Sequence, residues 1–299
     1  MPHTVFLRLR YAIVTQARGT SDPPDTSLAE APGKVSPTAP RAGGLARGTA
    51  QRPGGHAEDL ALPELVAVHI RGYAQKHPGQ PIEVLDAGCG LDCDDLGLRR
   101  VYGGGLEVHL TGMDDDGPLA RAVAAARTDL NSFALGDLRT VPLLPRSFDI
   151  VHCDRLLERI AHAELVLDRL VNGLKPGGLL VLRMADRDCA AGFIDRRLPR
   201  LARKLLWRWL HPGRPGPYPA VYERIVSTRG IQWFALLRGL AIAVCRELAV
   251  NGSRADRRGL RFAAVCRLVE RLSRGHITAG HDELLMVIRK PEHRFARVL

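Results

Sequence analysis

The stretch EVLDAGCGLDC, residues 83–93, has the residue order of a buried strand that ends in a ligand-binding turn. An apolar run leads to Asp86, and glycines follow at positions 88 and 90. Glycine adopts positive φ readily and lets the backbone approach a ligand closely. Two glycines also occur in turns that bind nothing, so the remainder of the chain has to decide between the two readings.

Four further apolar runs follow this turn, over residues 107–114, 132–137, 147–153 and 177–186. Residues 156–174 lie between the last two runs, show apolar residues at helical spacing, and reach a stop signal at Gly173. Strands that alternate with helices are typical of a doubly wound, mostly parallel α/β sheet with helices on both faces. We predict that fold class.

The N-terminal region differs from the rest in composition. Residues 19–55 are rich in Pro, Gly, Ala, Ser and Thr and contain few large apolar residues, so their burial cannot offset the entropy cost of ordering them. We expect a disordered leader over residues 1–57 and a single domain over 58–299, beginning with a helix.

The C-terminal region is strongly basic. Residues 186–299 hold 23 basic and 10 acidic residues, whereas residues 61–185 hold 13 and 17. The pattern predicts helices over 191–210, with a break at Pro199, and over 261–273. A segment over 229–248 begins as a helix and ends as a strand, and 282–291 forms the last, antiparallel strand. The charge concerns the surface and its partners, not the fold.

Composition excludes several classes of protein. No apolar run approaches the roughly 18 residues that a membrane helix needs. Six scattered cysteines lack the framework of a small secreted domain, which favours a reducing cytoplasm. Because no second Cys or His pair at zinc-ligand spacing complements Cys89 and Cys93, we predict no metal site.

Acidic residues follow two of the predicted strands. Asp114 ends the second, 24 residues after Gly90, and Asp137 follows the third. Ligands of parallel sheets bind at the carboxyl ends of the strands, where a carboxylate can accept both hydroxyls of a ribose. Alternatively, residues 114–116 are a solvated charge run or a helix cap.

Taken in order, these segments resemble the class I S-adenosylmethionine-dependent methyltransferases of the small-molecule type. The resemblance spans about residues 81–185 and rests on VLDAGCG, LTGMD, GDLRTVPLLPRSFDIVHC and LKPGGLLVLR. It implies a Rossmann-like sheet, S-adenosylmethionine as the cofactor and a small molecule as the methyl acceptor. Residues 58–185 would then be the cofactor-binding half, and 186–299 a helix-rich substrate and lid region.

The resemblance also implies a set of cofactor-binding residues: Asp86, Gly88, Gly90, Met113, Asp114, Asp137, Leu138 and Cys153. The two glycines would line the methionine part with support from the first aspartate, and Asp114 would bind the ribose. Asp137 would accept from the adenine amino group while Leu138 holds the ring, which Met113 or Asp115 would flank. Cys153 would face the methionine or the transferred methyl. Asp92 replaces a third glycine, which supports the alternative of a non-catalytic member of the fold.

Methyl transfer needs alignment and sometimes a base, because its sulfonium leaving group is already good. Candidate bases at the end of the fourth strand are His152, Asp154 and Glu158. All three end or follow that strand, near the rim of the predicted site.

Aromatic residues in the C-terminal region suggest how the acceptor is held. Trp207, Tyr218, Tyr222 and Trp233 are candidate substrate-binding residues for an apolar or aromatic acceptor that carries an acidic group and lies beneath a lid helix. The basic segment 196–214 could instead rest on an anionic membrane surface.

Two other enzyme classes share such a sheet. A nucleic-acid methyltransferase would use the basic region, but HCDR, residues 152–155, stands where NPPY or DPPY would, so we do not expect nucleic acid as a partner. An NAD-dependent oxidoreductase requires G-x-G-x-x-G, and Cys93 occupies the third glycine position.

Overall fold

A computed structural model describes residues 62–90, 106–210, 216–249 and 257–292. The chain divides into two units, Met1–Leu60 and Ala61–Leu299. The predicted leader over residues 1–57 and the Asp92 position lie outside the described residues.

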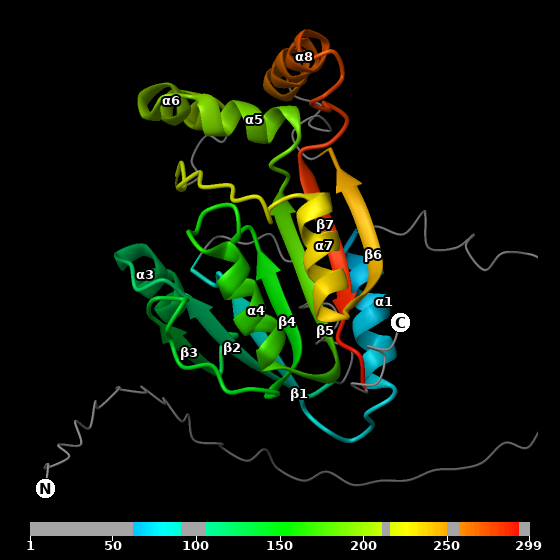
Figure 1. The fold of residues 1–299 in the computed structure, drawn as a ribbon. Coiled ribbons are helices and arrows are strands. Elements are labelled where there is room, and N and C mark those ends of the chain that lie inside the picture. The colour runs from blue at the N-terminus through cyan, green and yellow to red at the C-terminus, as the bar shows by residue number, and fades with distance from the viewer. Residues whose placement is uncertain (1–61, 91–105, 211–215, 250–256, 293–299) are drawn as a thin grey trace, which may run out of the picture. The chain divides into compact units, whose positions relative to one another are not determined.

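The described residues form a seven-stranded sheet in the order β3-β2-β1-β4-β5-β7-β6 (Figure 1). The strands are β1 (Ile82–Ala87), β2 (Val108–Asp114), β3 (Ser132–Leu135), β4 (Phe148–Asp154), β5 (Leu174–Ala185), β6 (Ala241–Leu248) and β7 (Glu283–Arg289). β7 runs antiparallel to both of its neighbours, and the pairings from β3 to β5 are parallel. The predicted doubly wound sheet with an antiparallel last strand is confirmed.

Helices lie on both faces of this sheet and beyond the carboxyl ends of β4 and β5. They are α1 (Leu62–Ala74), α3 (Pro118–Ala126), α4 (Ala163–Gly173), α5 (Ala190–Arg197), α6 (Arg200–Leu210), α7 (Thr228–Arg238) and α8 (Arg257–Leu272). α4 and α7 pack on one face, and α1 packs on the other (Figure 1). The break at Pro199 falls where the sequence predicts it, between α5 and α6.

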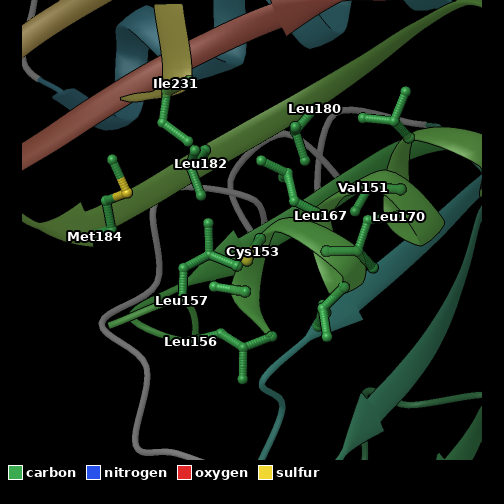
Figure 2. Close-up of a cluster of buried hydrophobic side chains, with 14 of the residues drawn as sticks. Val151, Cys153, Leu156, Leu157, Leu167, Leu170, Leu180, Leu182, Met184 and Ile231 are labelled. Carbon is green, nitrogen blue, oxygen red and sulfur yellow. The ribbon is translucent and has the colours of Figure 1, made fainter. Parts of the chain in front are cut away.

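The two-residue period of the strands divides the core between these faces. Leu85 and Val151 join the cluster under α4 and α7, whereas their neighbours Val84 and Ile150 join the cluster under α1. Figure 2 shows side chains of β4 and β5 packed among those of α4, with Ile231 of α7 beside them. Each large side chain buried in this way contributes about 1.5 to 3 kcal/mol.

α4 begins later than its periodicity predicts, at Ala163. The carboxylate of Glu223 accepts hydrogen bonds from the backbone N–H groups of His162 and Ala163, at 2.7 and 2.9 Å. These donors have no partner inside the helix, so a side chain 61 residues away fixes where the helix starts.

α5, α6 and α8, here called the lid helices, gather beyond the carboxyl ends of β4 and β5 (Figure 1). Their shared core consists of Ala190, Leu210, Phe262 and Cys266. Across the described ranges, no helix combines the length and apolar character that crossing a bilayer requires.

Candidate functional site

Asp114 connects the first two strand ends. Its Oδ2 accepts the backbone N–H of Gly90 at 2.8 Å, and its Oδ1 accepts that of Asp115 at 2.8 Å. Burial raises the pKa of Asp114, although both hydrogen bonds oppose this effect. The two residues predicted to act together, 24 positions apart, are therefore in direct contact.

The structure also distinguishes between the alternatives for residues 114–116, which were a solvated charge run or a helix cap. Asp114 is buried, while Asp116 is exposed and pairs with Arg121. The N-cap of α3 is Gly117, which makes no side-chain capping bond. The solvated run therefore describes Asp116 but not Asp114, and none of the three carboxylates provides the N-cap of α3.

Both glycines of the turn are required by their surroundings. Gly88 has φ of +93° and donates its N–H to the carbonyl of Met113 at 2.7 Å. A Cβ at Gly90 would lie 2.6 Å from the Cα and Cβ of Ala120, closer than real Cβ contacts allow. Any larger residue at position 90 would push the turn away from α3.

A cavity of about 400 Å³, here called the cofactor hollow, lies beside these strand ends. Its volume is in the range typical of small-ligand sites. It is lined by Asp115, Asp137, Leu138, Arg139, Arg159, Ile160, Ala161 and Val166. The predicted adenine-binding residues Asp137 and Leu138 thus share a cavity with Asp115.

Asp137 is exposed and paired with its near neighbour Arg139. The guanidinium donates to both carboxylate oxygens, with Nε to Oδ1 at 2.8 Å and Nη2 to Oδ2 at 2.7 Å. These bonds lower the pKa of Asp137 to about 2. The carboxylate is ionised at neutral pH and can accept a further hydrogen bond in the hollow.

Asp86 precedes the glycine turn and is held by two basic side chains. His152 Nδ1 donates to Asp86 Oδ1 at 3.0 Å, and Arg127 donates to Oδ2 at 2.5 Å. Burial raises the pKa of Asp86, but these two partners outweigh it and hold the pKa below its usual value. Burial lowers the pKa of His152, and Asp86 more than compensates, so it lies above the ordinary value. His152 is therefore bound to Asp86, with its Nε2 unpaired among the described residues.

The other two candidate bases are also buried. Neither carboxylate oxygen of Asp154 has a hydrogen-bond partner in the described part of the chain, and the Arg183 guanidinium lies 3.9 Å away. Burial raises the pKa of Asp154. Burial also raises the pKa of Glu158 to about 7, against the opposing charge of Arg155. A pKa of about 7 suits Glu158 to act as a general base at neutral pH.

Met113 and Cys153 lie in the hydrophobic core. Both belong to the cluster under α4 and α7, and Figure 2 shows Cys153 surrounded by core side chains. Burial raises the pKa of the Cys153 thiol well above its usual value. Neither side chain therefore lines the cofactor hollow. Met113 contributes to the site through its backbone carbonyl, which accepts the N–H of Gly88 in the glycine turn.

A second hollow, here called the acceptor hollow, lies between the ends of β4 and β5 and the lid helices. It is lined by Arg155, Ala185, Ala191, Gly192, Ile194, Asp195, Arg203, Leu206, Trp207, Leu210, Tyr222, Phe262, Asp282 and Glu283. Trp207 and Tyr222 thus line the same hollow, and the Tyr218 ring stands edge-on to Trp207 with the ring centroids 5.7 Å apart. Trp233 lies on α7, is 62% exposed, and lines neither hollow.

Several charged residues of the site were not predicted from the sequence. Arg155 has φ of +48°, a conformation that costs energy outside glycine, and pairs with Glu283 at 2.9 Å. Arg183 donates to the same Glu283 at 2.8 Å. An arginine inside the apolar run LLVLRMA was the available signal, because a buried charge requires a partner.

Residues 85–182 match the family profile described as "Methyltransferase domain". No curated protein sequence matches the chain. The stretch matched by the profile contains the glycine turn, Asp114, Asp137 and the candidate bases, and this family indicates S-adenosylmethionine as the cofactor.

Three solved structures illustrate the structural likeness. An S-adenosylmethionine-dependent methyltransferase from Mesorhizobium loti is 20% identical, with 76% of this chain and 98% of the other covered and a TM-score of 0.46. The [4+2]-cyclase SpnF is 15% identical over 77% and 82%, with a TM-score of 0.44. Phosphoethanolamine N-methyltransferase 2 from Haemonchus contortus, solved with S-adenosyl-L-methionine, is 14% identical over 75% and 52%, with a TM-score of 0.44.

These likenesses are too weak to assign an activity, so the family rests on the profile match and on the order of the motifs. Residues 85–182 are a methyltransferase domain, in agreement with the class I S-adenosylmethionine-dependent family that the motifs resemble.

Proposed function

We propose that this chain is an S-adenosylmethionine-dependent methyltransferase that acts on a small-molecule acceptor. The observation that carries the proposal is the buried Asp114 carboxylate bonded to Gly90, within a stretch that matches a methyltransferase domain. The cofactor hollow beside it has room for a nucleoside.

The residues present fit this cofactor. A Cβ at Gly88 would lie 3.3 Å from the carbonyl oxygen of Asp154 and 3.4 Å from Arg159, so glycine leaves space along the turn that any side chain would take. Asp115 and Asp137 offer carboxylate acceptors for hydroxyl and amino groups, and Leu138 and Ile160 offer apolar surface for a flat base. When bound, S-adenosylmethionine supplies an electrophilic methyl group.

The acceptor would enter the second hollow. Trp207, Tyr222 and Phe262 give it aromatic walls, and its charged residues are largely paired with one another, as in the Arg155–Glu283 pair. This lining favours an uncharged apolar or aromatic acceptor. Glu158, whose Oε1 accepts the N–H of Ala185 in the lining of this hollow at 3.4 Å, is the residue we assign to take a proton from the acceptor.

We also propose a reducing compartment, the cytoplasm, as the working environment. Cys89, Cys153, Cys189, Cys245 and Cys266 are free thiols in the described ranges. Unpaired, mostly buried thiols are typical of reducing conditions.

Calorimetric titration tests the proposal directly. We expect the full-length protein to bind S-adenosylmethionine and S-adenosylhomocysteine and not NAD. Asp114→Ala should abolish binding, because the turn loses the carboxylate that holds Gly90. Asp116→Ala is the matched control, since Asp116 is exposed and pairs only with surface Arg121 in the contacts described. Failure of the intact protein to bind either adenosyl compound would instead identify a non-catalytic member of the fold.

A further inference from the structure

α8 is apolar on two sides. Its inner side buries Phe262 and Cys266 against α5 and α6. Its outer side carries Leu260, Val265, Leu268 and Leu272, which are 49 to 76% exposed. One apolar face of a helix is explained by packing, but a second exposed one needs another partner.

The outer side of α8 is also strongly basic. Arg257, Arg261, Arg267 and Arg271 are exposed among these apolar residues. The helix contains one acidic residue, Glu270, whose carboxylate accepts the backbone N–H of Ala279 at 3.2 Å. Arginine and leucine therefore share one surface with little negative charge to balance it.

α6 repeats the same combination next to α8. Leu201 and Leu205 are 78 and 68% exposed, and Lys204 and Arg208 are exposed beside them. α6 contains no acidic residue, and Arg258 of α8 donates to the carbonyl of Trp209 at 3.0 Å, which joins the two helices. Figure 1 shows α8 on the side of the α5–α6 pair that faces away from the sheet.

The chemistry of this surface selects among three kinds of partner. A second copy of the chain would bring arginines against arginines, which is repulsive. A nucleic acid would match the charge but would offer no apolar interior to the four exposed side chains of α8. An anionic lipid bilayer matches both, because headgroups attract the arginines while the acyl boundary receives the leucines.

We propose that the outer side of α8, together with Leu201 and Leu205 of α6, docks on the surface of an anionic membrane. The helices lie on the bilayer and do not cross it. The acceptor hollow lies under the same helices, with Leu210 and Phe262 in its wall, so docking would bring its lining close to the lipid surface. The docking surface itself does not depend on the proposed methyl transfer.

Sedimentation of the full-length protein with vesicles tests this proposal. We expect binding to phosphatidylcholine vesicles that contain about one third phosphatidylglycerol, and little binding to phosphatidylcholine alone. Binding should weaken as salt shortens the Debye length to about 3 Å at 1 M. Leu268→Glu with Leu272→Glu should reduce vesicle binding about tenfold or more, because carboxylates replace the inserting groups.

The matched control places the same change on another exposed helix face. Leu236→Glu with Leu237→Glu on α7, where the side chains are 69 and 54% exposed, should leave vesicle binding unchanged. Equal binding of the α8 variant and the wild type would overturn the proposal. So would a wild-type dimer without lipid that the α8 variant converts to a monomer, since the face would then join two copies.

Calorimetry with S-adenosylmethionine separates this proposal from the assigned function. The α8 variant should keep the wild-type cofactor affinity, which also shows that it is folded. If the wild-type protein binds S-adenosylmethionine but does not bind anionic vesicles, membrane docking is rejected and the methyltransferase proposal is retained.

Discussion

The Asp86–His152 pair makes stability depend on pH in a predictable direction. The pKa of His152 lies above its ordinary value of 6.5. Its contribution to the free energy of unfolding is therefore complete below pH 6.5 and is lost as the pH rises through the raised pKa. Asp86 has a lowered pKa, so it stays ionised over this range and loses its contribution only in acid. Asp154 and Arg127 also act on the His152 ring, the first raising its pKa and the second lowering it.

We therefore predict that His152→Leu costs about 1 to 3 kcal/mol at pH 6, because Asp86 loses a buried charged partner. The difference in unfolding free energy from the wild type should be smaller at pH 9 than at pH 6, because the imidazole loses its charge as the pH rises through its raised pKa. Urea unfolding at both pH values measures the change. Parallel pH profiles for the two proteins would contradict the prediction.

The substitution Gly90→Ala should distort the glycine turn. The new Cβ would lie 2.6 Å from Ala120 and 2.8 Å from the Asp114 carboxylate, so α3 or the turn must move. We expect a stability loss of about 1 to 3 kcal/mol and weaker binding of S-adenosylmethionine. Chemical denaturation and calorimetry give the two numbers.

Gly72→Ala provides the control for that substitution. Gly72 lies inside α1, and a Cβ there meets no atom within 4 Å. Alanine should stabilise the helix by about 0.5 to 1 kcal/mol. A destabilised Gly72→Ala, or a neutral Gly90→Ala, would contradict the packing described here.

The lid helices behave as an element of their own. Phe262 supplies the largest buried side chain between α8 and the α5–α6 pair. Phe262→Ala should cost about 3 kcal/mol locally, because the cavity left behind cannot fully collapse. Amide hydrogen exchange should quicken in α5, α6 and α8 while β1 and β4 stay protected. Equal loss of protection throughout the sheet would show that the lid and the sheet unfold together.

At the level of helices and strands, most of the fold and part of the candidate site could be predicted from the sequence. Strand β1 and the break at Pro199 follow from local patterns, since periodicity and proline act within a few residues. The start of α4 could not be predicted, because Glu223 comes from a segment 61 residues away. The burial of Cys153 and the exposure of Trp233 depend on which helix covers each face, which a single strand or helix pattern does not specify.

At the scale of the molecule, the two proposed functions occupy different parts of the chain. The cofactor hollow is built from the ends of β2 and β3 and the loop before α4, and its charged lining consists of Asp115, Asp137, Arg139 and Arg159. The docking surface is built from α6 and α8, where basic residues prevail. The basic charge of the C-terminal half of the sequence therefore belongs in part to the proposed docking surface and not to the fold.

This division predicts independent effects of substitutions. Asp114→Ala should remove cofactor binding and leave vesicle binding intact, and Leu272→Glu should do the reverse. Asp114 contacts Gly90 and Asp115, whereas Leu272 is 76% exposed on α8, so their effects on unfolding free energy should add within about 0.5 kcal/mol. Urea unfolding of the two single variants and the double variant measures that sum. A coupling energy above about 1 kcal/mol would mean that the lid helices and the cofactor turn form one cooperative unit, and occupancy of the cofactor hollow would then alter membrane binding as well.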